Sequence, residues 1–152
     1  MFRKAERKDC QSVYALICDM ERRELPYEPF REIFQGQLDD ERYCCLLDER
    51  DGRVAGMLNL RFEEQLHHAS RIAEILEFVV DPALRDRGIG KRLLGEARRI
   101  AAERGCVQLE VDCNQLRTDT HRFYLREGMQ NCHYKFSESL TGEDAAENRI
   151  GR

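Results

Sequence analysis

The sequence predicts a single mixed α/β sandwich in which most neighbouring strands are antiparallel. Three observations carry this prediction. Segments with a two-residue hydrophobic period and segments with helical spacing follow one another along the chain. Three consecutive strand-like segments in the middle are separated only by short connections, which favours antiparallel pairing. The length of 152 residues fits one domain that can bury a core without disulfides or metals.

The first part of the chain begins with a short strand over residues 2–5. Asp9 is then expected to cap a helix that runs to about Arg23, because apolar side chains recur there at helical spacing. Two prolines follow this helix. Apolar residues over 30–38 have the same spacing and predict a second, shorter amphipathic helix.

The middle of the chain is predicted to form three strands. Residues 43–48 and 54–62 flank a turn that contains Asp51 and Gly52, a dipeptide typical of hairpins. Residues 72–80 form a third long strand that ends at an Asp-Pro pair. These segments predict the antiparallel part of the sheet.

Two helices and another strand are expected in the second half. Residues 89–104 carry the buried stripe of an amphipathic helix that ends near a glycine. Residues 107–113 alternate at a period of two and predict a strand. Thr118 or Asp119 is expected to cap a short helix that runs through Glu127.

The chain is expected to end in a short strand and a tail. Residues 134–136 belong to the predicted last strand, and the chain becomes polar after Ser137. We therefore expect one domain over residues 1–137 and a polar, flexible tail over 138–152.

The composition excludes several classes of protein. Apolar residues make up 41% and charged residues 36%, which excludes collagen-like, low-complexity and wholly disordered chains. No apolar run approaches the ~20 residues that a membrane span needs. The first nine residues lack the apolar segment of a signal peptide. We therefore expect a soluble, cytoplasmic protein.

Seven cysteines are scattered along the chain, an odd number without a C-x-x-C pair. Most of them lie in apolar runs, where a reduced cysteine behaves as a small core residue. We expect structural thiols, and a catalytic or metal-binding thiol is the alternative.

The charge is unevenly distributed. The formal net charge is −4, which argues against a general nucleic-acid binder. Between Arg85 and Arg104, however, the chain has seven basic residues and only three acidic ones. A local cationic segment in an acidic chain indicates an anionic ligand, and a solvated helix face is the alternative.

A loop with two glycines joins the third long strand to this basic helix, with the sequence Arg85-Asp86-Arg87-Gly88-Ile89-Gly90-Lys91. Free backbone N–H groups and the macrodipole at a helix start bind anions, and glycine lets a phosphate approach the backbone. The loop lacks both the Walker pattern and the third glycine of a dinucleotide-binding fingerprint. It therefore predicts a phosphate-binding loop of another kind.

The pattern Arg85-x-x-Gly88-x-Gly90 resembles motif A of the GCN5-related N-acetyltransferase (GNAT) superfamily, whose loop holds the pyrophosphate of acetyl-coenzyme A. After the next strand, residues 121–129 resemble the superfamily's F-Y-x-x-x-G-F element, with Met129 where phenylalanine is usual. The resemblance covers nearly the whole chain. It implies the GNAT fold, a mixed and mostly antiparallel sheet with helices on both faces.

A narrower resemblance is to the aminoalkylphosphonate N-acetyltransferases. It rests on residues 13–18, 66–68 and 120–128, of which the first two segments lie outside the cofactor motifs. It implies direct transfer of an acetyl group from acetyl-coenzyme A to the primary amine of an aminoalkylphosphonate. A polyamine, an amino-sugar antibiotic or a protein amine as acceptor, and a non-catalytic acyl-coenzyme A sensor, are the alternatives.

The same resemblance implies which residues bind acetyl-coenzyme A. The pyrophosphate would lie against the backbone of the glycine loop, and the end of the third long strand would bond the pantetheine arm. Asn114 is a further candidate, although more residues than usual separate it from Tyr124. The expected cofactor-binding residues are Phe78, Val80, Arg85, Arg87, Gly88, Ile89, Gly90, Lys91 and Asn114.

Acetyl transfer also needs a base, because an alkylammonium of pKa ~10.4 is neutral only about once per thousand molecules at pH 7. By the resemblance, Glu74 falls at the catalytic glutamate and Tyr124 is the general acid for the leaving thiolate. Glu77 is the alternative base. The odd spacing predicts that a regular strand points the two glutamates to opposite faces. A surface ion pair for each glutamate and a packing role for Tyr124 are the structural alternatives.

The acceptor side rests on histidines. A phosphonate favours arginine, lysine or protonated histidine, so His67, His68 and His121 are candidates for binding it. An exposed or hydrogen-bonded loop histidine is the alternative for each. A divalent metal is an option within the phosphonate group, but the residue spacing assigns no metal site. A homodimer is a further option, as in many relatives.

Overall fold

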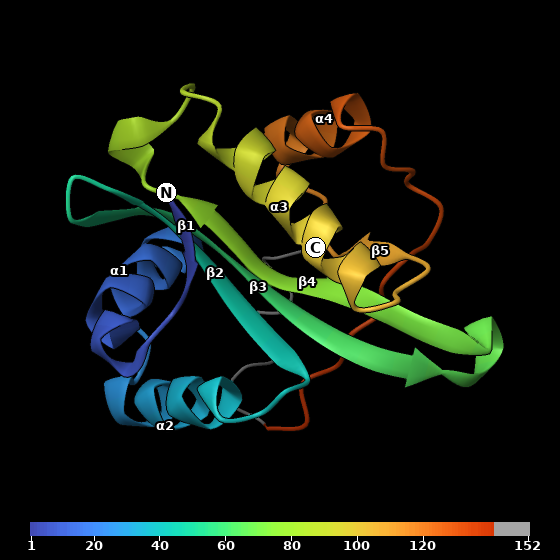
Figure 1. Cartoon of the computed structure of the whole chain (residues 1–152), viewed down its shortest axis with the longest axis horizontal. Helices are drawn as coiled ribbons and strands as arrows, with labels where there is room; N and C mark the ends of the chain where they lie inside the picture. Colours follow the sequence, from blue (N-terminus) through green and yellow to red (C-terminus); the bar gives the residue numbers. More distant parts are fainter. Residues whose placement is uncertain (142–152) are drawn as a thin grey trace. The chain divides into compact units, whose positions relative to one another are not determined.

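A five-stranded sheet in the order β1-β2-β3-β4-β5 organises the first part of the chain (Figure 1). The computed structural model describes residues 1–141. β1 to β4 pair antiparallel, whereas β4 and β5 are parallel, which confirms the predicted mixed sheet. The strands are β1 Phe2–Lys4, β2 Tyr43–Arg50, β3 Arg53–Gln65, β4 Ser70–Val80 and β5 Leu109–Val111.

The chain divides into two compact units, Met1–Val111 and Asp112–Arg152. The sheet and three helices belong to the first unit, and one helix belongs to the described part of the second. A single domain over 1–137 stays a prediction. Of the predicted tail, residues 142–152 lie outside the described residues, and 138–141 contain no helix or strand.

Helices α1 (Cys10–Glu21) and α2 (Tyr27–Leu38) cover one face of the sheet. The helical spacing of Val13, Leu16 and Ile17 turns these side chains inward, where they are buried. They belong to one apolar cluster with residues of α2 and the sheet, among them Phe34, Leu47, Met57 and Val79. This cluster fixes both helices against the strands that carry the candidate site.

Helix α3 (Ile89–Glu103) covers the opposite face with its buried apolar stripe, which confirms helices on both faces. Gly56 of β3 permits the close approach of this helix. A Cβ at Gly56 would lie 3.0 Å from Leu93 Cδ1 and 3.3 Å from Ile89 Cγ2. The adjacent Met57 lies in the α1 and α2 cluster, as the alternation of a strand requires.

The start of α1 depends on a buried ion pair. Asp9 is the N-cap residue, as predicted, but its carboxylate does not cap the helix. It accepts two 2.8 Å hydrogen bonds from the Arg3 guanidinium and one of 2.7 Å from the Glu6 backbone. The Arg3 guanidinium holds the pKa of Asp9 below its usual range, despite the opposing effect of burial. Asp9 thus ties β1 to the first helix.

A β-bulge decides where the two glutamates of β4 point. The register shifts by one after Asn59, which leaves Leu76 without a partner on β3. Glu77 is opposite Asn59, and Glu74 is opposite Arg61, two residues further along a regular stretch of β3. Directly opposite residues share a face, so both glutamates point to the side of α1 and α2. The prediction of opposite faces is wrong because it assumed a regular strand.

In the second unit, α4 (Thr118–Arg126) is the one regular element among residues 112–141. Its start and end lie close to the predicted bounds. The predicted last strand over 134–136 is wrong, since this segment is not a strand and Tyr134 and Phe136 are exposed. Its alternation fits a strand, but a strand also needs a neighbour that bonds its backbone, and a hydrophobic period does not specify that neighbour.

All seven cysteines, which lie within the described residues, are free thiols. Cys10 and Cys44 are buried, and Cys132 is exposed. Burial raises the pKa of Cys45 to about 12 and raises the pKa of Cys44 as well. These two are therefore protonated packing residues, as expected for structural thiols.

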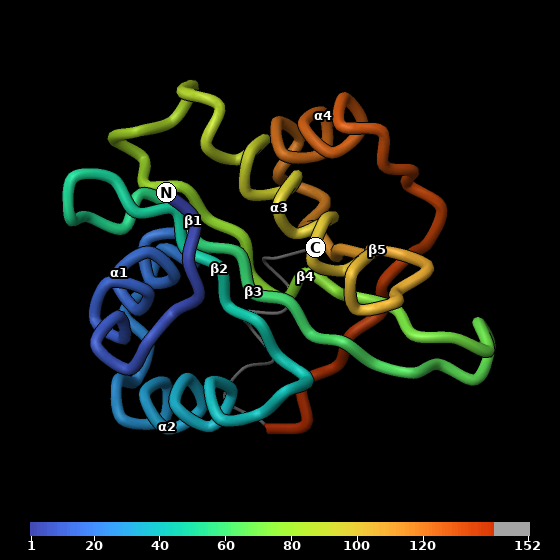
Figure 2. The backbone as a smooth tube through the Cα atoms, viewed as in Figure 1, coloured from blue at the N-terminus to red at the C-terminus, as the bar shows by residue number. Residues whose placement is uncertain are grey.

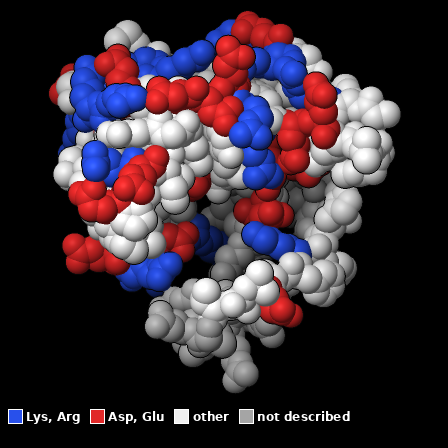
Figure 3. All heavy atoms as spheres, turned by 90° about the horizontal axis from the view of Figure 1, so that it is seen from below, with Lys and Arg blue, Asp and Glu red and all other residues white. Residues whose placement is uncertain are grey.

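The surface carries charges of both signs. On the face drawn in Figure 3, basic and acidic side chains are interspersed over the described residues. Within residues 1–141, no helix combines the length and the apolar character needed to cross a membrane.

Candidate active site

The glycine loop leads into α3 as a backbone cradle. Gly88 is the N-cap residue and has a φ of +74°, a left-handed conformation that glycine adopts without strain. Its position carries no side-chain cap, so the N–H groups of the first turn point out of the helix start. A Cβ at Gly88 would lie 3.1 Å from Arg92 Nη1 and would crowd this cradle.

Positive side chains surround the cradle. Arg85, Arg87, Lys91 and Arg92 are all exposed, and Arg92 donates a 3.1 Å hydrogen bond to the Arg87 carbonyl. Together with the helix dipole, these cations favour an anion at the N-terminus of α3. The loop therefore has the backbone geometry and the charge that a pyrophosphate requires.

β4 continues beyond its pairing with β5. The parallel ladder ends at Ile75, whereas β4 runs on to Val80. The N–H of Asp81 donates to the Ala55 carbonyl (2.8 Å), so the alternation of an antiparallel ladder turns the backbone groups of Phe78 and Val80 away from β3. They point to the side on which β5 pairs earlier in the strand. This orientation supports the predicted backbone bonds to an extended pantetheine arm.

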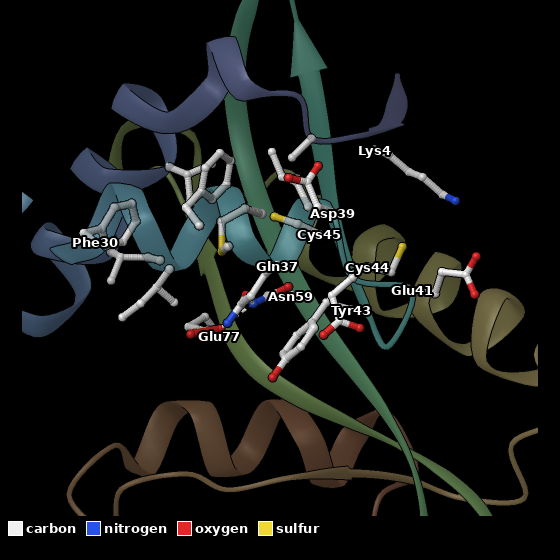
Figure 4. A pocket seen from close by; sticks show the side chains of 18 of the residues that line it. Lys4, Phe30, Gln37, Asp39, Glu41, Tyr43, Cys44, Cys45, Asn59 and Glu77 are labelled. Carbon is white, nitrogen blue, oxygen red and sulfur yellow. Dashed lines mark hydrogen bonds between the residues drawn. The ribbon is translucent and has the colours of Figure 1, made fainter. Parts of the chain in front are cut away.

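A cavity of about 700 Å³ lies between the two N-terminal helices and the sheet (Figure 4). Its apolar wall includes Val13, Ile17, Phe30, Phe34 and Met57. Three polar side chains, Gln37, Asn59 and Glu77, converge in it from α2, β3 and β4. A concave apolar wall with a few convergent polar groups is typical of a small-molecule site.

Hydrogen bonds hold Glu77 in this cavity. Asn59 Nδ2 donates to Glu77 Oε2 at 3.0 Å and to Gln37 Oε1 at 2.9 Å. Asn59 is only 6% exposed, and its Oδ1 has no hydrogen-bond partner among the described residues. The central asparagine thus links the glutamate to both β3 and α2.

Burial raises the pKa of Glu77 above the usual glutamate value, and the hydrogen bond from Asn59 opposes this shift. A carboxylate with a raised pKa accepts a proton more readily at neutral pH, which is the property of a general base. Glu77 therefore combines position, burial and basicity in one cavity.

Glu74 lies on the same face but in an ion pair. Arg61 donates to Glu74 Oε2 at 2.6 Å and to Glu63 Oε1 at 3.1 Å. The Glu74 side chain is 20% exposed and is not among the described residues that line the cavity. Its surroundings match the structural alternative of a surface ion pair.

Tyr124 lies near the end of α4, where its side chain is half-buried. Burial raises the pKa of the phenol above the usual tyrosine value, and Cys113 adds to the shift. The phenol is therefore protonated at neutral pH, as a general acid must be before it acts.

Asn114 and His121 both stabilise the start of α4. Asn114 Oδ1 accepts a 2.9 Å hydrogen bond from the Leu116 backbone. The Asn114 carbonyl accepts from the Arg117 backbone at 3.0 Å and from His121 Nε2 at 2.8 Å. The cofactor role of Asn114 and the substrate role of His121 stay predictions.

His67 and His68 lie in a short 3-10 turn (Leu66–His68) at the tip of the β3–β4 hairpin, which projects beyond the neighbouring strands (Figure 2). His68 Nδ1 contacts Gln65 Oε1 at 2.6 Å. Between the hairpin tip and Glu77, β4 spans roughly 20 Å at the usual rise per residue. The structure therefore does not bring these histidines to the cavity, and their substrate role stays a prediction.

Sequence reasoning missed Asn59 and Gln37. A signal existed for Asn59, because it is a polar residue within the apolar strand 54–60. Gln37 gave no such signal, since glutamines are common on exposed helix faces.

Comparisons with known proteins cover most of the chain. The model of the acetyltransferase (GNAT) family matches residues 10–129. An aminoalkylphosphonate N-acetyltransferase from Salmonella typhimurium is 43% identical over 138 residues, which are 91% of this chain and 90% of that protein.

Solved structures share the fold. A transcriptional regulator from Bacillus halodurans has a TM-score of 0.86 at 24% identity, over 92% of this chain and 99% of that one. Glucosamine-6-phosphate N-acetyltransferase from Arabidopsis thaliana has a TM-score of 0.78 at 20% identity, over 93% and 98% of the two chains. At these identities, the likeness shows the fold alone.

Proposed function

This chain belongs to the acetyltransferase (GNAT) family, and from this premise we propose that it acetylates the primary amine of a small aminoalkylphosphonate. The family match confirms the predicted reaction class, and the solved structures confirm the predicted fold. Members of the family use acetyl-coenzyme A. One observation carries the proposed substrate class, the 43% identity to the Salmonella enzyme over nine-tenths of both chains. The proposed transfer is direct, because no cysteine belongs to the glycine loop or to the Tyr124 motif.

Glu77 is the proposed general base. Its carboxylate takes a proton from the bound ammonium, directly or through a water, and the nitrogen lone pair then attacks the thioester carbonyl. The raised pKa of Glu77 and its position in the cavity support this role. Glu74 is the alternative, and its carboxylate is held in an ion pair with Arg61 and is not among the described residues that line the cavity.

The proposed cofactor site consists of backbone groups at the start of α3 and at the end of β4, together with exposed basic side chains. The N–H groups at the start of α3 and the side chains of Arg85, Arg87 and Lys91 hold the pyrophosphate. The backbone of Phe78 and Val80 bonds the pantetheine arm, and an N–H there polarises the thioester carbonyl.

Tyr124 is the proposed general acid. As the amine attacks, the C–S bond breaks and the phenol gives its proton to the thiolate of coenzyme A. The matching F-Y motif and the protonated state of the phenol support this role.

Charges in the cavity favour a second candidate acceptor. Lys4 and Arg104 line the cavity and would attract a phosphonate. Four acidic residues also line it, and these favour a polycationic acceptor such as a polyamine, namely Asp39, Asp40, Glu41 and Glu77.

The test is thiol release from acetyl-coenzyme A across a panel of acceptors. It contains aminomethylphosphonate, 1- and 2-aminoethylphosphonate, spermidine, an aminoglycoside and a lysine peptide. Each reaction is run with and without a divalent metal, because metal dependence is an option within the phosphonate group. Within residues 1–141, no group of three or more histidine, cysteine or carboxylate side chains is arranged to hold a metal ion. Sedimentation of the same preparation tests whether the chain is a monomer or a homodimer.

Turnover confined to the phosphonates supports the proposal. Turnover with spermidine alone leaves the mechanism in place and replaces the substrate class. Tight binding of acetyl-coenzyme A without any turnover contradicts the proposal and favours the sensor function.

A further inference from the structure

Asn59 occupies an unusual position for a polar side chain. It lies in the middle of β3, in register with Glu77 on one side and Cys45 on the other, and is almost fully buried. Its strand neighbours Leu58 and Leu60 are completely buried apolar residues. An amide in such surroundings costs free energy unless both its donors and its acceptor are bonded.

The hydrogen bonds determine which end of the amide is which. One terminal atom of Asn59 lies within hydrogen-bond distance of two oxygens, Glu77 Oε2 and Gln37 Oε1. An ionised carboxylate only accepts hydrogen bonds, so this atom is the nitrogen. The two N–H groups are thereby both used.

The other end of the amide is an acceptor without a donor. Asn59 Oδ1 is buried and has no hydrogen-bond partner among residues 1–141, although Asn59 lines the cavity. A buried oxygen of this kind is rare in a native structure, because it forfeits its hydrogen bonds to water. Because Asn59 lines the cavity, a molecule bound there is the source of a donor that residues 1–141 do not provide.

We propose that Asn59 Oδ1 accepts a hydrogen bond from the acceptor amine, so that Asn59 and Glu77 form a two-point amine site. This inference rests on the proposed function. An ammonium has three N–H groups, of which one gives its proton to Glu77 and a second bonds to Asn59 Oδ1. The lone pair released by that proton transfer is then held in a fixed direction for attack on the thioester carbonyl.

The same side chain has a positioning role through its other end. The bond from Asn59 Nδ2 to Glu77 Oε2 holds the carboxylate against β3 and opposes the rise in its pKa, while the second bond ties the amide to Gln37 of α2. Asn59 thus serves two functions, amine binding through oxygen and orientation of the base through nitrogen. The two functions are separable by substitution.

The experiment compares Asn59→Asp with Asn59→Ala. The aspartate keeps an oxygen toward the amine but loses the N–H donors and adds a negative charge beside Glu77, whereas alanine loses both the oxygen and the donors. KM is measured separately for the amine and for acetyl-coenzyme A, and kcat is followed against pH. Asn131→Ala makes the same chemical change at an exposed position and serves as the control.

We expect Asn59→Ala to raise KM for the amine about 10- to 100-fold, as for the loss of one hydrogen bond to a charged donor. Asn59→Asp keeps an amine KM no higher than that of the wild type, because its carboxylate retains the oxygen and also attracts the ammonium. Both variants move the acid limb of the kcat profile to higher pH, because Glu77 loses a bond that stabilises its ionised form. KM for acetyl-coenzyme A stays unchanged in both.

An amine KM in Asn59→Ala equal to that of the wild type overturns the inference, because Oδ1 would then hold only a water. An equal rise in Asn59→Asp also overturns it, since the retained oxygen would have no effect. If alanine prevents folding, Asn59→Ser replaces it, because its shorter hydroxyl does not reach the same position.

The failure of the proposed function is a different result. A wild-type protein that binds acetyl-coenzyme A but acetylates no amine in the panel contradicts both proposals together. A wild-type protein that acetylates an amine, with an Asn59→Ala variant of unchanged amine KM, contradicts this inference alone.

Discussion

At the scale of single residues, burial and hydrogen bonding set the chemistry of the two proposed proton carriers. Burial raises the pKa of both Glu77 and Tyr124. For the carboxylate, a raised pKa makes a stronger base. For the phenol, it keeps the proton in place until the thiolate develops. The same physical effect therefore favours opposite roles in two different groups.

Glu77→Gln tests the base. We expect kcat to fall about 100-fold or more, because the variant lacks proton transfer, while KM for acetyl-coenzyme A is retained. In the wild type, kcat/KM rises with pH through the pKa of Glu77, which lies above the usual ~4.3 because of burial. In the variant this acid limb disappears, as measured by initial rates across pH.

Glu74→Gln is the matched control for that prediction. It removes a half-exposed ion pair with Arg61, which is worth up to about 1 kcal/mol of stability. We expect kcat of this variant to remain near that of the wild type. The reverse pattern, with Glu74→Gln inactive and Glu77→Gln active, would assign the base to Glu74.

Glu77→Gln also has a stability consequence of defined sign. Because the folded-state pKa of Glu77 is raised, its ionisation opposes folding above that pKa, and this penalty vanishes below the pKa of the unfolded chain. We expect the variant to have a higher Tm than the wild type at pH 8. Calorimetry at falling pH should show the difference shrinking, and a constant difference would contradict the burial argument.

Tyr124→Phe tests the acid. The variant keeps the ring but has no proton to give, so we expect kcat to fall about 100-fold with unchanged binding of coenzyme A. Fluorescence or calorimetric titration checks the binding, and thiol release checks kcat. A variant with wild-type kcat would assign Tyr124 to packing, the alternative that its half-buried position also allows.

At the scale of the elements, close packing of α3 on β3 carries the glycine loop to its position. Gly56 provides the space for this contact, with Leu93, Ile89 and the Val79 carbonyl all within 3.3 Å of a Cβ built there. Gly95, in the same helix, has no atom within 4 Å of such a Cβ. A side chain is therefore excluded at Gly56 but would fit at Gly95.

Gly56→Ala and Gly95→Ala should change stability in opposite directions. At Gly56 we expect a loss of about 1–3 kcal/mol, because the added methyl overfills the interface between helix and strand. At Gly95 we expect a gain of about 0.5–1 kcal/mol, because alanine is the better helix former. Urea unfolding checks both, and a gain at Gly56 would show that α3 shifts at little cost.

At the scale of the whole molecule, the cationic segment over residues 85–104 lies in a chain whose formal net charge is −4. Arg85, Arg87 and Lys91 are exposed at the start of α3, where the helix dipole has the same sign. In the proposed function, coenzyme A brings its phosphates to this site through water, so the attraction depends on ionic strength.

Salt should therefore weaken cofactor binding more than catalysis. Raising the ionic strength from ~0.1 M to ~1 M shortens the screening length from ~10 Å to ~3 Å. We expect KM for acetyl-coenzyme A to rise several-fold, while kcat at saturation changes little. Initial rates at several salt concentrations check this. A KM for acetyl-coenzyme A that does not change with salt would show that uncharged contacts dominate cofactor binding.

The sequence by itself predicted the main helices and strands of the first unit and the glycine loop between β4 and α3. Hydrophobic periods over Cys10–Glu21 and Ile89–Glu103 predicted α1 and α3, and the Asp51-Gly52 turn predicted the β2–β3 hairpin. These features are encoded locally, because side-chain spacing and glycine conformation act within a few residues. The family resemblance singled out Glu74, and Glu77 was the alternative because it is the second carboxylate on the same predicted strand.

Only the tertiary structure decided the surroundings of these glutamates. The bulge at Leu76 places both on one face, where Asn59 bonds Glu77 across the strands and Arg61 bonds Glu74. The predicted strand over 134–136 failed on the same ground, since alternation in sequence does not supply a neighbouring strand. Register, bulges and cross-strand contacts depend on residues far apart in the chain, and a local pattern carries no information about that pairing.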